Sequence, residues 1–494
     1  MDQTNQSEAA SSGFEKAAGA QPGAGDGPIV ADSVQVYSRN IKGTFRTIKW
    51  SAIWILLGLY YVAPWLRWDR GPNAPGQALL VDMPGRRAYF FDIEIWPQEV
   101  YYLVGILIIA AVGLFLATAL AGRIWCGFFC VQTVWTDLFM WVERHIEGDR
   151  NARIRLDKGP LTFSKAFKKI TKHIAWMLIS LATGGAWIMY FKDAPTFTVE
   201  FFTGTASYNL YGFTLLFAGT TYILAGWARE AVCIYMCPWP RFQSAMFDEH
   251  SLIVTYEEWR GEPRGKSRRD ADFTGRGHCV DCTMCVQVCP TGVDIRQGQQ
   301  MACIGCALCV DACNSIMDRF NLPRGLITYD STANQVARSK DQATKFLPLR
   351  PRTIIYAAVM LIAAAVMLFS LVSRERLEIN VLRDRAPLFV RLSDGGIRNG
   401  YTFKVLNMER LAKTYTLALD GIDGATLAVI GIVKEGATSA TLPVKPDTIG
   451  TFRVFVKAPR RSLPEKSMDM NFLLTDQKTG KVYPHETVFA GPGR

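Results

Sequence analysis

The chemistry of this chain is concentrated in its cysteines, and eight of the twelve fall into two runs of identical spacing. Each run reads C-x2-C-x2-C-x3-C, as in two-cluster bacterial ferredoxins, where the fourth cysteine of each run binds the other run's cluster. We therefore predict two 4Fe–4S clusters. Their ligands would be Cys279, Cys282, Cys285 and Cys313 for cluster 1, and Cys303, Cys306, Cys309 and Cys289 for cluster 2.

Two other uses of these cysteines need to be weighed. Structural zinc sites usually appear as two separated C-x2-C pairs, and disulfides are rare in a reducing compartment. Thiolates at the observed spacing instead suit iron–sulfur chemistry. The double motif therefore indicates one-electron transfer.

The remaining four cysteines form two C-x3-C pairs, Cys126/Cys130 and Cys233/Cys237. On a helix, residues four apart share one face, with Cβ atoms about 5–6 Å apart, so both sulfurs of a pair could reach one metal ion. Thiolates prefer soft ions such as Cu(I), and also iron–sulfur clusters. Two alternatives stay open: ordinary buried cysteines, and a redox disulfide between the pairs.

Membrane helices must position these pairs. Five apolar stretches are long enough to cross a bilayer: Lys49–Trp65, Val100–Ala121, His173–Phe191, Tyr208–Ala228 and Ile354–Val372. Spans one and two end at the first C-x3-C pair, and spans three and four end at the second, which makes a weak internal repeat. Each helical hairpin therefore delivers one pair to the same edge of the membrane.

The distribution of positive charge predicts the orientation. Lys and Arg collect in residues 131–173 and 230–352, whereas the loop 192–206 contains only Lys192. Such basic regions face the cytoplasm. The N-terminus and the ferredoxin runs are then cytoplasmic, and the C-terminus is periplasmic. The net charge of +11 is explained by these basic segments, which would face the anionic lipid headgroups of the membrane. We therefore expect no nucleic-acid partner.

The chain divides into five predicted parts. Residues 1–33 would be a disordered cytoplasmic tail, without a cleavable signal peptide. Residues 34–249 would be a four-span membrane domain, 250–345 a ferredoxin-like α+β insert, and 346–373 a fifth span. Residues 374–494 alternate apolar and polar residues in runs such as Tyr401–Leu406, Thr414–Leu419 and Phe452–Lys457. That pattern predicts an all-β sandwich.

Several single residues receive secondary interpretations. After Cys130 an amphipathic helix is expected along the membrane surface or packed on the spans, with Asp137 and Arg144 on its polar side. Asp311 and Asp318 are read as solvated charges. Met468 and Met470 share one face of a probable strand and are expected to pack in its core rather than bind copper.

The motifs around the C-x3-C pairs resemble a known family. Cys126-Gly-Phe-Phe-Cys130, followed by Gln132 to Met140, and the segment from Cys237-Pro238 to Asp248 are similar to the CcoG/FixG/RdxA family. Its members are accessory proteins of cytochrome c oxidase. The resemblance extends from about residue 34 to the C-terminus, through both ferredoxin runs.

This resemblance implies a cytoplasmic-membrane protein with two 4Fe–4S clusters and an immunoglobulin-like C-terminal domain. It also implies reduction of Cu(II) to Cu(I) for assembly of a cbb-type oxidase, with Cys126, Cys130, Cys233 and Cys237 as the candidate copper site. In the family pattern the first pair also ends in proline, whereas Val131 follows Cys130 here. That difference puts the local geometry of this half-site in question.

Three functions follow as hypotheses. The leading one is a cupric reductase that receives electrons from a cytoplasmic donor and passes Cu(I) to a copper-exporting ATPase or a copper chaperone. The second is a quinol-linked membrane ferredoxin relay. The third is a non-catalytic scaffold for the oxidase assembly machinery. A homodimer is also compatible with the sequence.

Overall fold

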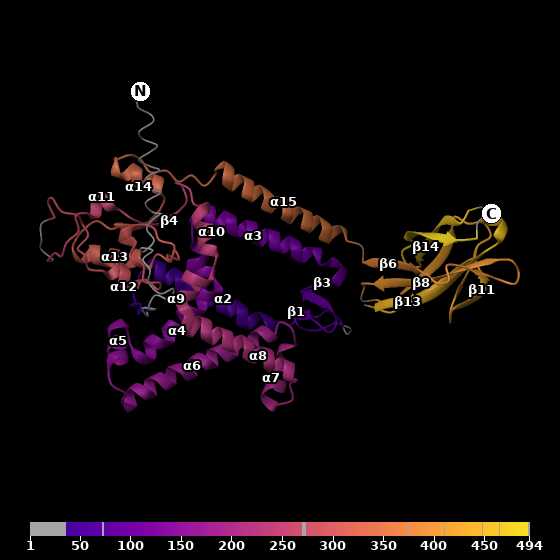
Figure 1. The fold of residues 1–494 in the computed structure, drawn as a ribbon, viewed down its shortest axis with the longest axis horizontal. Helices are drawn as coiled ribbons and strands as arrows, with labels where there is room; N and C mark the ends of the chain where they lie inside the picture. The colour runs from indigo at the N-terminus through magenta and orange to yellow at the C-terminus, as the bar shows by residue number, and fades with distance from the viewer. Residues whose placement is uncertain are drawn as a thin grey trace, which may run out of the picture. The chain divides into compact units, whose positions relative to one another are not determined.

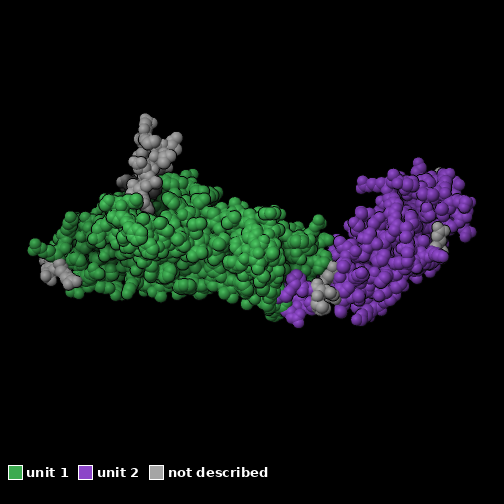
Figure 2. Space-filling view, turned by 90° about the horizontal axis from the view of Figure 1, so that it is seen from below, with its two compact units in different colours: residues 1–68, 77–367 green, residues 69–76, 368–494 purple. Residues whose placement is uncertain are grey.

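The computed structural model describes residues 36–71, 74–268, 273–374, 376–409, 411–446, 448–463 and 465–492. The predicted tail, residues 1–33, lies outside them. The chain forms two compact units, coloured green and purple in Figure 2: unit 1 contains residues 1–68 and 77–367, and unit 2 contains residues 69–76 and 368–494.

Unit 1 is mainly helical (Figure 1). Its membrane-side helices are α2 (Thr44–Val62), α3 (Tyr101–Ala121), α4 (Val131–Glu147), α5 (Arg150–Lys158), α6 (Phe163–Ile188), α7 (Ala194–Thr203), α8 (Tyr208–Thr221), α9 (Arg229–Ala231), α10 (Trp239–Met246) and α15 (Pro351–Ser373). Three π-helical turns interrupt them: η3 (Trp125–Phe129), η4 (Tyr222–Ala228) and η5 (Val232–Met236). Single 3-10 turns are η1 (Ala63–Trp65) and η2 (Pro97–Glu99).

Three helical stretches of the described chain are long and apolar enough to cross a membrane: Pro97–Ala121, Tyr208–Met236 and Pro351–Ser373. They contain three of the five predicted spans. The other two predicted spans fall mostly on α2 and α6, which are helical but carry charge at their N-terminal ends. Lys49 of α2 and Lys172 of α6 are both buried. These charges leave a shorter apolar stretch on each of the two helices.

Small residues on α3 let α15 approach it closely, and the two helices lie side by side in Figure 1. A Cβ added at Gly105 would lie 2.3 Å from the Met367 Sδ, and one added at Gly113 would lie 3.6 Å from the Met360 Sδ. Close approach at small residues is the usual way in which membrane helices pack. The outward side chains of both helices are apolar and exposed, as expected for helices that face lipid.

Helix α4 is packed inside unit 1, and its carboxylates are buried. Asp137 accepts a hydrogen bond of 2.7 Å from the Arg46 guanidinium, and the Lys49 ammonium lies 3.5 Å away. Of the two placements expected for this helix, packing on the other helices is the one that the structure supports, and cations from α2 cover its polar side. Burial alone would raise the pKa of Asp137, but the charges of Lys49, Arg46 and Arg144 outweigh this effect and lower the pKa to about 2.

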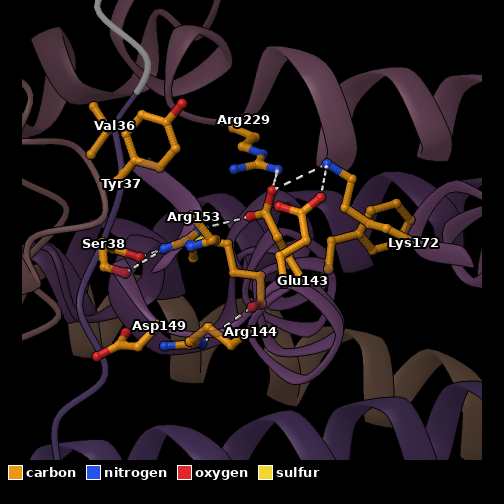
Figure 3. Close-up of polar contacts among 12 residues, drawn as sticks. Val36, Tyr37, Ser38, Glu143, Arg144, Asp149, Arg153, Lys172 and Arg229 are labelled. Carbon is orange, nitrogen blue, oxygen red and sulfur yellow. Dashed lines mark hydrogen bonds and ion pairs between the residues drawn. The ribbon is translucent and has the colours of Figure 1, made fainter. Parts of the chain in front are cut away.

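Glu143 is a second buried carboxylate on α4, and cations from three other helices pair with it. Figure 3 shows Lys172 and Arg229 directed at Glu143, with nitrogen–oxygen distances of 3.5 Å and 3.1 Å. Arg153 donates to Glu143 at 2.7 Å and to the Ser38 carbonyl at 2.6 Å. This network joins the segment before α2 to α4, α5, α6 and α9.

The ferredoxin-like part of unit 1 is built on a two-stranded antiparallel ribbon. Strand β4 (Ile253–Tyr256) pairs with β5 (Ile327–Asp330). Between and after them lie α11 (Glu258–Gly261), α12 (Met284–Val288), η6 (Ile295–Gln297), α13 (Leu308–Arg319) and α14 (Thr332–Ser339). Its core contains Cys279 and Cys285 together with apolar side chains of both strands.

A small sheet in the loop between the first two predicted spans was not predicted. Its strands are β1 (Leu79–Asp82), β2 (Arg87–Phe90) and β3 (Ile93–Ile95), in the order β1-β2-β3. The Arg87 guanidinium lies 3.9 Å from the centre of the Trp96 ring and pairs with Glu94 at 3.0 Å. Strands of three and four residues are too short to give a clear alternating pattern.

Unit 2 is a sandwich of two antiparallel sheets around one apolar core. One sheet has the order β11-β10-β13-β8-β6, with β7 beside β8, and the other has the order β12-β9-β14-β15. The strands are β6 (Leu377–Arg383), β7 (Val390–Arg391), β8 (Ile397–Asn407), β9 (Lys413–Asp420), β10 (Thr426–Val429), β11 (Val433–Ala437), β12 (Ser439–Val444), β13 (Thr448–Ala458), β14 (Ser467–Asp476) and β15 (Val482–Ala490), with the turn η7 (Arg460–Ser462) after β13.

The strand pattern of unit 2 agrees with the sequence. The three alternating runs fall within β8, β9 and β13. Met470 is 2 % exposed and belongs to the core, and Met468 packs against that core. The expectation that these two methionines serve packing is therefore confirmed.

Candidate iron–sulfur and cysteine site

The two ferredoxin runs have the same backbone conformation. Asp281 and Gly305 occupy equivalent positions with φ of 47° and 69°, and Thr283 and Ala307 follow with φ of 54° and 56°. Positive φ is costly for residues other than glycine, and such strain gathers where a loop must clamp a ligand. In the second run the Gly305 N–H is directed at the Cys303 sulfur. The backbone of each loop therefore curves around the cysteines of its own run.

The four cysteines predicted for cluster 1 line a single cavity. Cys279, Cys282 and Cys285 of the first run meet Cys313 of the second run there, and apolar side chains such as Leu326 complete the wall. Burial raises the pKa of both Cys285 and Cys313 to about 12. Such thiols ionise readily only when a metal takes the place of the proton. The donor set therefore fits an iron–sulfur cluster.

The cysteines predicted for cluster 2 also gather in one place. Cys309 lies within electrostatic reach of Cys306, Cys303 and Cys289, and burial raises its pKa well above the usual value. The Cys289 sulfur is additionally 3.4 Å from the Thr291 hydroxyl. Three cysteines of one run and the fourth of the other again form the set.

The first cysteine of each C-x3-C pair lies in a π-helical turn and the second cysteine directly follows that turn, whereas the spacing suggested an α-helix. The Cys130 N–H donates to the Trp125 carbonyl and the Cys237 N–H to the Val232 carbonyl, both at 2.8 Å and both five residues back. The wider turn follows a helix end in each hairpin. π-Helical turns are rare and often occur at functional sites.

The residue after each pair makes little difference to this geometry. Cys130 has φ −62° and ψ 130°, and Cys237 has φ −82° and ψ 121°, although the first is followed by Val131 and the second by Pro238. Val131 is the first residue of α4, a position that accepts proline and other residues equally well. The question raised by Val131 is therefore answered: both half-sites have the same backbone shape.

The first C-x3-C loop touches the second ferredoxin run directly. A Cβ added at Gly127 would lie 3.0 Å from both the Cys306 Cα and the Gly305 carbonyl oxygen, so only glycine fits there without displacement. Cys126 and Cys233 also pack on the apolar group that contains Cys306 and Ile304. The structure therefore places Cys126 and Cys233 beside Cys306, a predicted ligand of cluster 2.

The four hairpin cysteines lie near one another. Burial raises the pKa of Cys126 to about 12, and the charges of Cys130, Cys233 and Cys237 also influence it. The Cys126 sulfur is 3.3 Å from the Gln243 amide oxygen, whereas Cys237 is exposed. Among the described residues, no three His, Cys, Asp or Glu side chains are arranged around a single metal ion. The copper assignment stays a prediction.

One aspartate next to these sites, Asp311, differs from its sequence interpretation. Asp311 is buried and accepts the Arg46 N–H at 2.8 Å and the Phe45 N–H at 3.3 Å. Its interpretation as a solvated charge is wrong, because it caps the first turn of α2, whose backbone donors lack a partner within the helix. Asp318 does lie exposed and pairs with Arg324.

Arg123 was visible in the repeat as the arginine before Cys126, but no role was assigned to it. It is 4 % exposed and donates to carbonyl oxygens of the segment that enters the second ferredoxin run. The signal in the sequence was a second arginine near the second pair, since Arg229 lies four residues before Cys233 and Arg123 lies three residues before Cys126.

Three segments of the chain match known protein families. Residues 228–332 match the family model of a 4Fe-4S dicluster domain, and residues 103–147 match that of a 4Fe-4S binding domain. Residues 367–492 match a model described as the IG-like fold at the C-terminal of FixG. A solved FixG-related protein from Vibrio parahaemolyticus is 23% identical, with a TM-score of 0.21, covering 24% of this chain and 99% of that one.

Three curated relatives are similar over most of their length. The nitrogen fixation protein FixG of Rhizobium meliloti is 43% identical, covering 94% of both chains. Protein RdxB of Cereibacter sphaeroides is 45% identical, covering 94% of this chain and 98% of its own. Protein RdxA of the same organism is 46% identical, covering 88% and 92%. With its apolar helices and iron–sulfur domains, the chain belongs to the FixG/RdxA family of membrane 4Fe–4S proteins.

Proposed function

We propose that this protein reduces Cu(II) to Cu(I) at Cys126, Cys130, Cys233 and Cys237, for assembly of a cbb-type cytochrome c oxidase. The observation that carries the proposal is the contact of Gly127 with the backbone of Gly305 and Cys306. Because of this contact, the cysteines that could bind copper adjoin a predicted electron carrier rather than solvent.

We assign the cluster ligands as the sequence predicts them. Cys279, Cys282, Cys285 and Cys313 would hold cluster 1, and Cys303, Cys306, Cys309 and Cys289 would hold cluster 2. When bound, such clusters accept and release single electrons. The exposure of Cys282 supports entry of electrons at cluster 1 from a cytoplasmic donor, since this cysteine is open to solvent.

The hairpin cysteines have different roles in this proposal. Exposed Cys237 receives the Cu(II) ion, and half-buried Cys126 lies on the side of the predicted cluster 2. Each ion takes up one electron, and each thiol that binds it gives up its proton. Sulfur ligands hold the soft product Cu(I) better than Cu(II), so the site favours reduction.

The proposal also assigns a compartment to each part of the chain and a recipient for the Cu(I) ion. The basic segments 131–173 and 230–352 lie in the cytoplasm, and unit 2 lies in the periplasm as an immunoglobulin-like domain. The Cu(I) ion then passes to a copper-exporting ATPase or a copper chaperone, which delivers it to the oxidase assembly machinery.

The test is Cu(II) reduction by the purified, dithionite-reduced protein in detergent. We expect C233A/C237A to lose most of the activity while both clusters keep their visible absorbance. V131A is the matched control, because Val131 is 68% exposed at the start of α4, directly after Cys130, and carries no thiol. Full activity of C233A/C237A with intact clusters would refute the assigned copper site.

A second candidate is an electron relay without copper chemistry, as in quinol-linked membrane ferredoxins. The observation in its favour is the match of residues 103–147, which contain Cys126 and Cys130, to a 4Fe-4S binding domain. This candidate predicts cluster reduction by a quinol in membranes. Iron in excess of two 4Fe–4S clusters per chain, lost in C126A/C130A, would also favour it.

A further inference from the structure

The buried arginine before the first C-x3-C pair holds three parts of unit 1 together. The Arg123 guanidinium donates to the carbonyl oxygens of Gln300, Met301 and Cys303, where the second ferredoxin run begins. Its other nitrogen donates to the Pro240 carbonyl at 3.0 Å and the Ser244 hydroxyl at 2.6 Å, both on α10.

This guanidinium is not neutralised. Within the described part of the chain, its partners are carbonyl and hydroxyl oxygens and the face of the Phe247 ring, 5.7 Å away, and no carboxylate pairs with it. Burial lowers the pKa of Arg123, while the charges of Cys303 and Cys126 act in the opposite direction. A full positive charge therefore lies within electrostatic reach of a predicted cluster 2 ligand and a hairpin cysteine.

The charges around the cluster 1 cavity are different. Arg296 lines that cavity, but it lies 2.7 Å from Asp294 and 2.5 Å from Asp281. Two carboxylates share one guanidinium there, so the local charge is negative rather than positive. Net charge near an iron–sulfur cluster is one of the factors that set its reduction potential.

We propose that Arg123 is a positioning residue that raises the reduction potential of cluster 2 above that of cluster 1. The inference rests on the proposed two-cluster function. An electron that leaves the site of Cys279, Cys282, Cys285 and Cys313 then has a lower free energy at the site beside Arg123, next to Cys126. No proton is needed, because the guanidinium already carries the compensating charge.

The neighbouring Ser244 offers a clean test, since its hydroxyl accepts from Arg123. S244D supplies the missing carboxylate and leaves every carbonyl contact of Arg123 in place, and S244N is its uncharged control. R123M removes the charge, and R123K keeps it. The measurement is an EPR-monitored redox titration of the full-length holoprotein in detergent without copper, with C282S identifying the cluster 1 signal.

We expect S244D and R123M to lower the potential of cluster 2 alone, by about tenfold in its ratio of reduced to oxidised form, or about 59 mV for a one-electron couple. S244N and R123K should match the wild type. An unchanged cluster 2 potential in S244D, an equal shift in S244N, or an equal shift of both clusters would overturn the inference. If R123M fails to assemble, the S244D and S244N pair decides alone. Failure of Cu(II) reduction does not affect this titration.

Discussion

The contact between Gly127 and the second ferredoxin run gives the sharpest prediction of the structure. In G127A the new methyl group would lie 3.0 Å from the Cys306 Cα, 3.0 Å from the Gly305 oxygen and 3.1 Å from the Cys306 nitrogen. Ordinary contacts of a Cβ begin at 3.4 Å, so the three distances are short by 0.3 to 0.4 Å. All three atoms belong to backbone, which cannot rotate away.

The size of the effect follows from this geometry. Inserting a methyl group into a packed interior costs about 1–3 kcal/mol. Gly127 does not have a positive φ, so backbone strain adds nothing to this cost. If the whole cost appears in the unfolding barrier, the clusters of G127A should be lost about 5- to 150-fold faster than those of the wild type.

The assay is the half-life of the visible cluster absorbance at a fixed temperature, together with the rate of Cu(II) reduction. G219A is the matched control, because a Cβ at Gly219 in α8 meets nothing within 4 Å. We expect G127A to lose both stability and rate, since the first C-x3-C loop must move away from Cys306. Stability and rate equal to those of G219A would refute the contact.

Three further predictions concern the buried carboxylates. D137N leaves Arg46 and Lys49 buried without their carboxylate and should cost about 3–5 kcal/mol in denaturant unfolding in detergent. The folded pKa of Asp137, about 2, lies below the unfolded value of about 3.9. Its contribution is therefore complete above about pH 4 and lost as pH falls toward 2. Acid unfolding of D137N should lack this component, and an identical acid profile would contradict the assignment. In the same unfolding measurement D311A should cost about 1 kcal/mol through the lost cap of α2, whereas D318A, at an exposed site, should have the stability of the wild type.

Local patterns in the sequence were sufficient for the cysteine motifs and the sandwich strands. The ferredoxin spacing can be recognised within one short segment, because each loop is formed by residues of its own run. The alternating runs of unit 2 likewise record burial on one face of a strand. In both cases the information needed lies within about ten neighbouring residues.

Long-range partners account for what the sequence did not show. Asp311 and Arg46 are 265 positions apart, and Asp137 and Arg46 are 91 positions apart. A charged residue reads as solvated until its partner is placed beside it. The π-helical turns were missed for a different, local reason: a spacing of four residues suits an α-helix, whereas the N–H groups of Cys130 and Cys237 bond five residues back.

The two arginines of the internal repeat show how similar hairpins have come to differ. Arg229 donates to the Gly226 carbonyl at 2.7 Å and pairs at 3.1 Å with Glu143, a carboxylate that it shares with two other cations. Arg123, which precedes its cysteine pair by one residue less, reaches the ferredoxin run and meets no carboxylate among the described residues. The backbone turns of the two cysteine pairs are alike, but their electrostatic surroundings are not. Electrons from cluster 2 should therefore arrive on the Cys126 side, because Arg123 acts on both Cys126 and the predicted cluster 2 ligand Cys303.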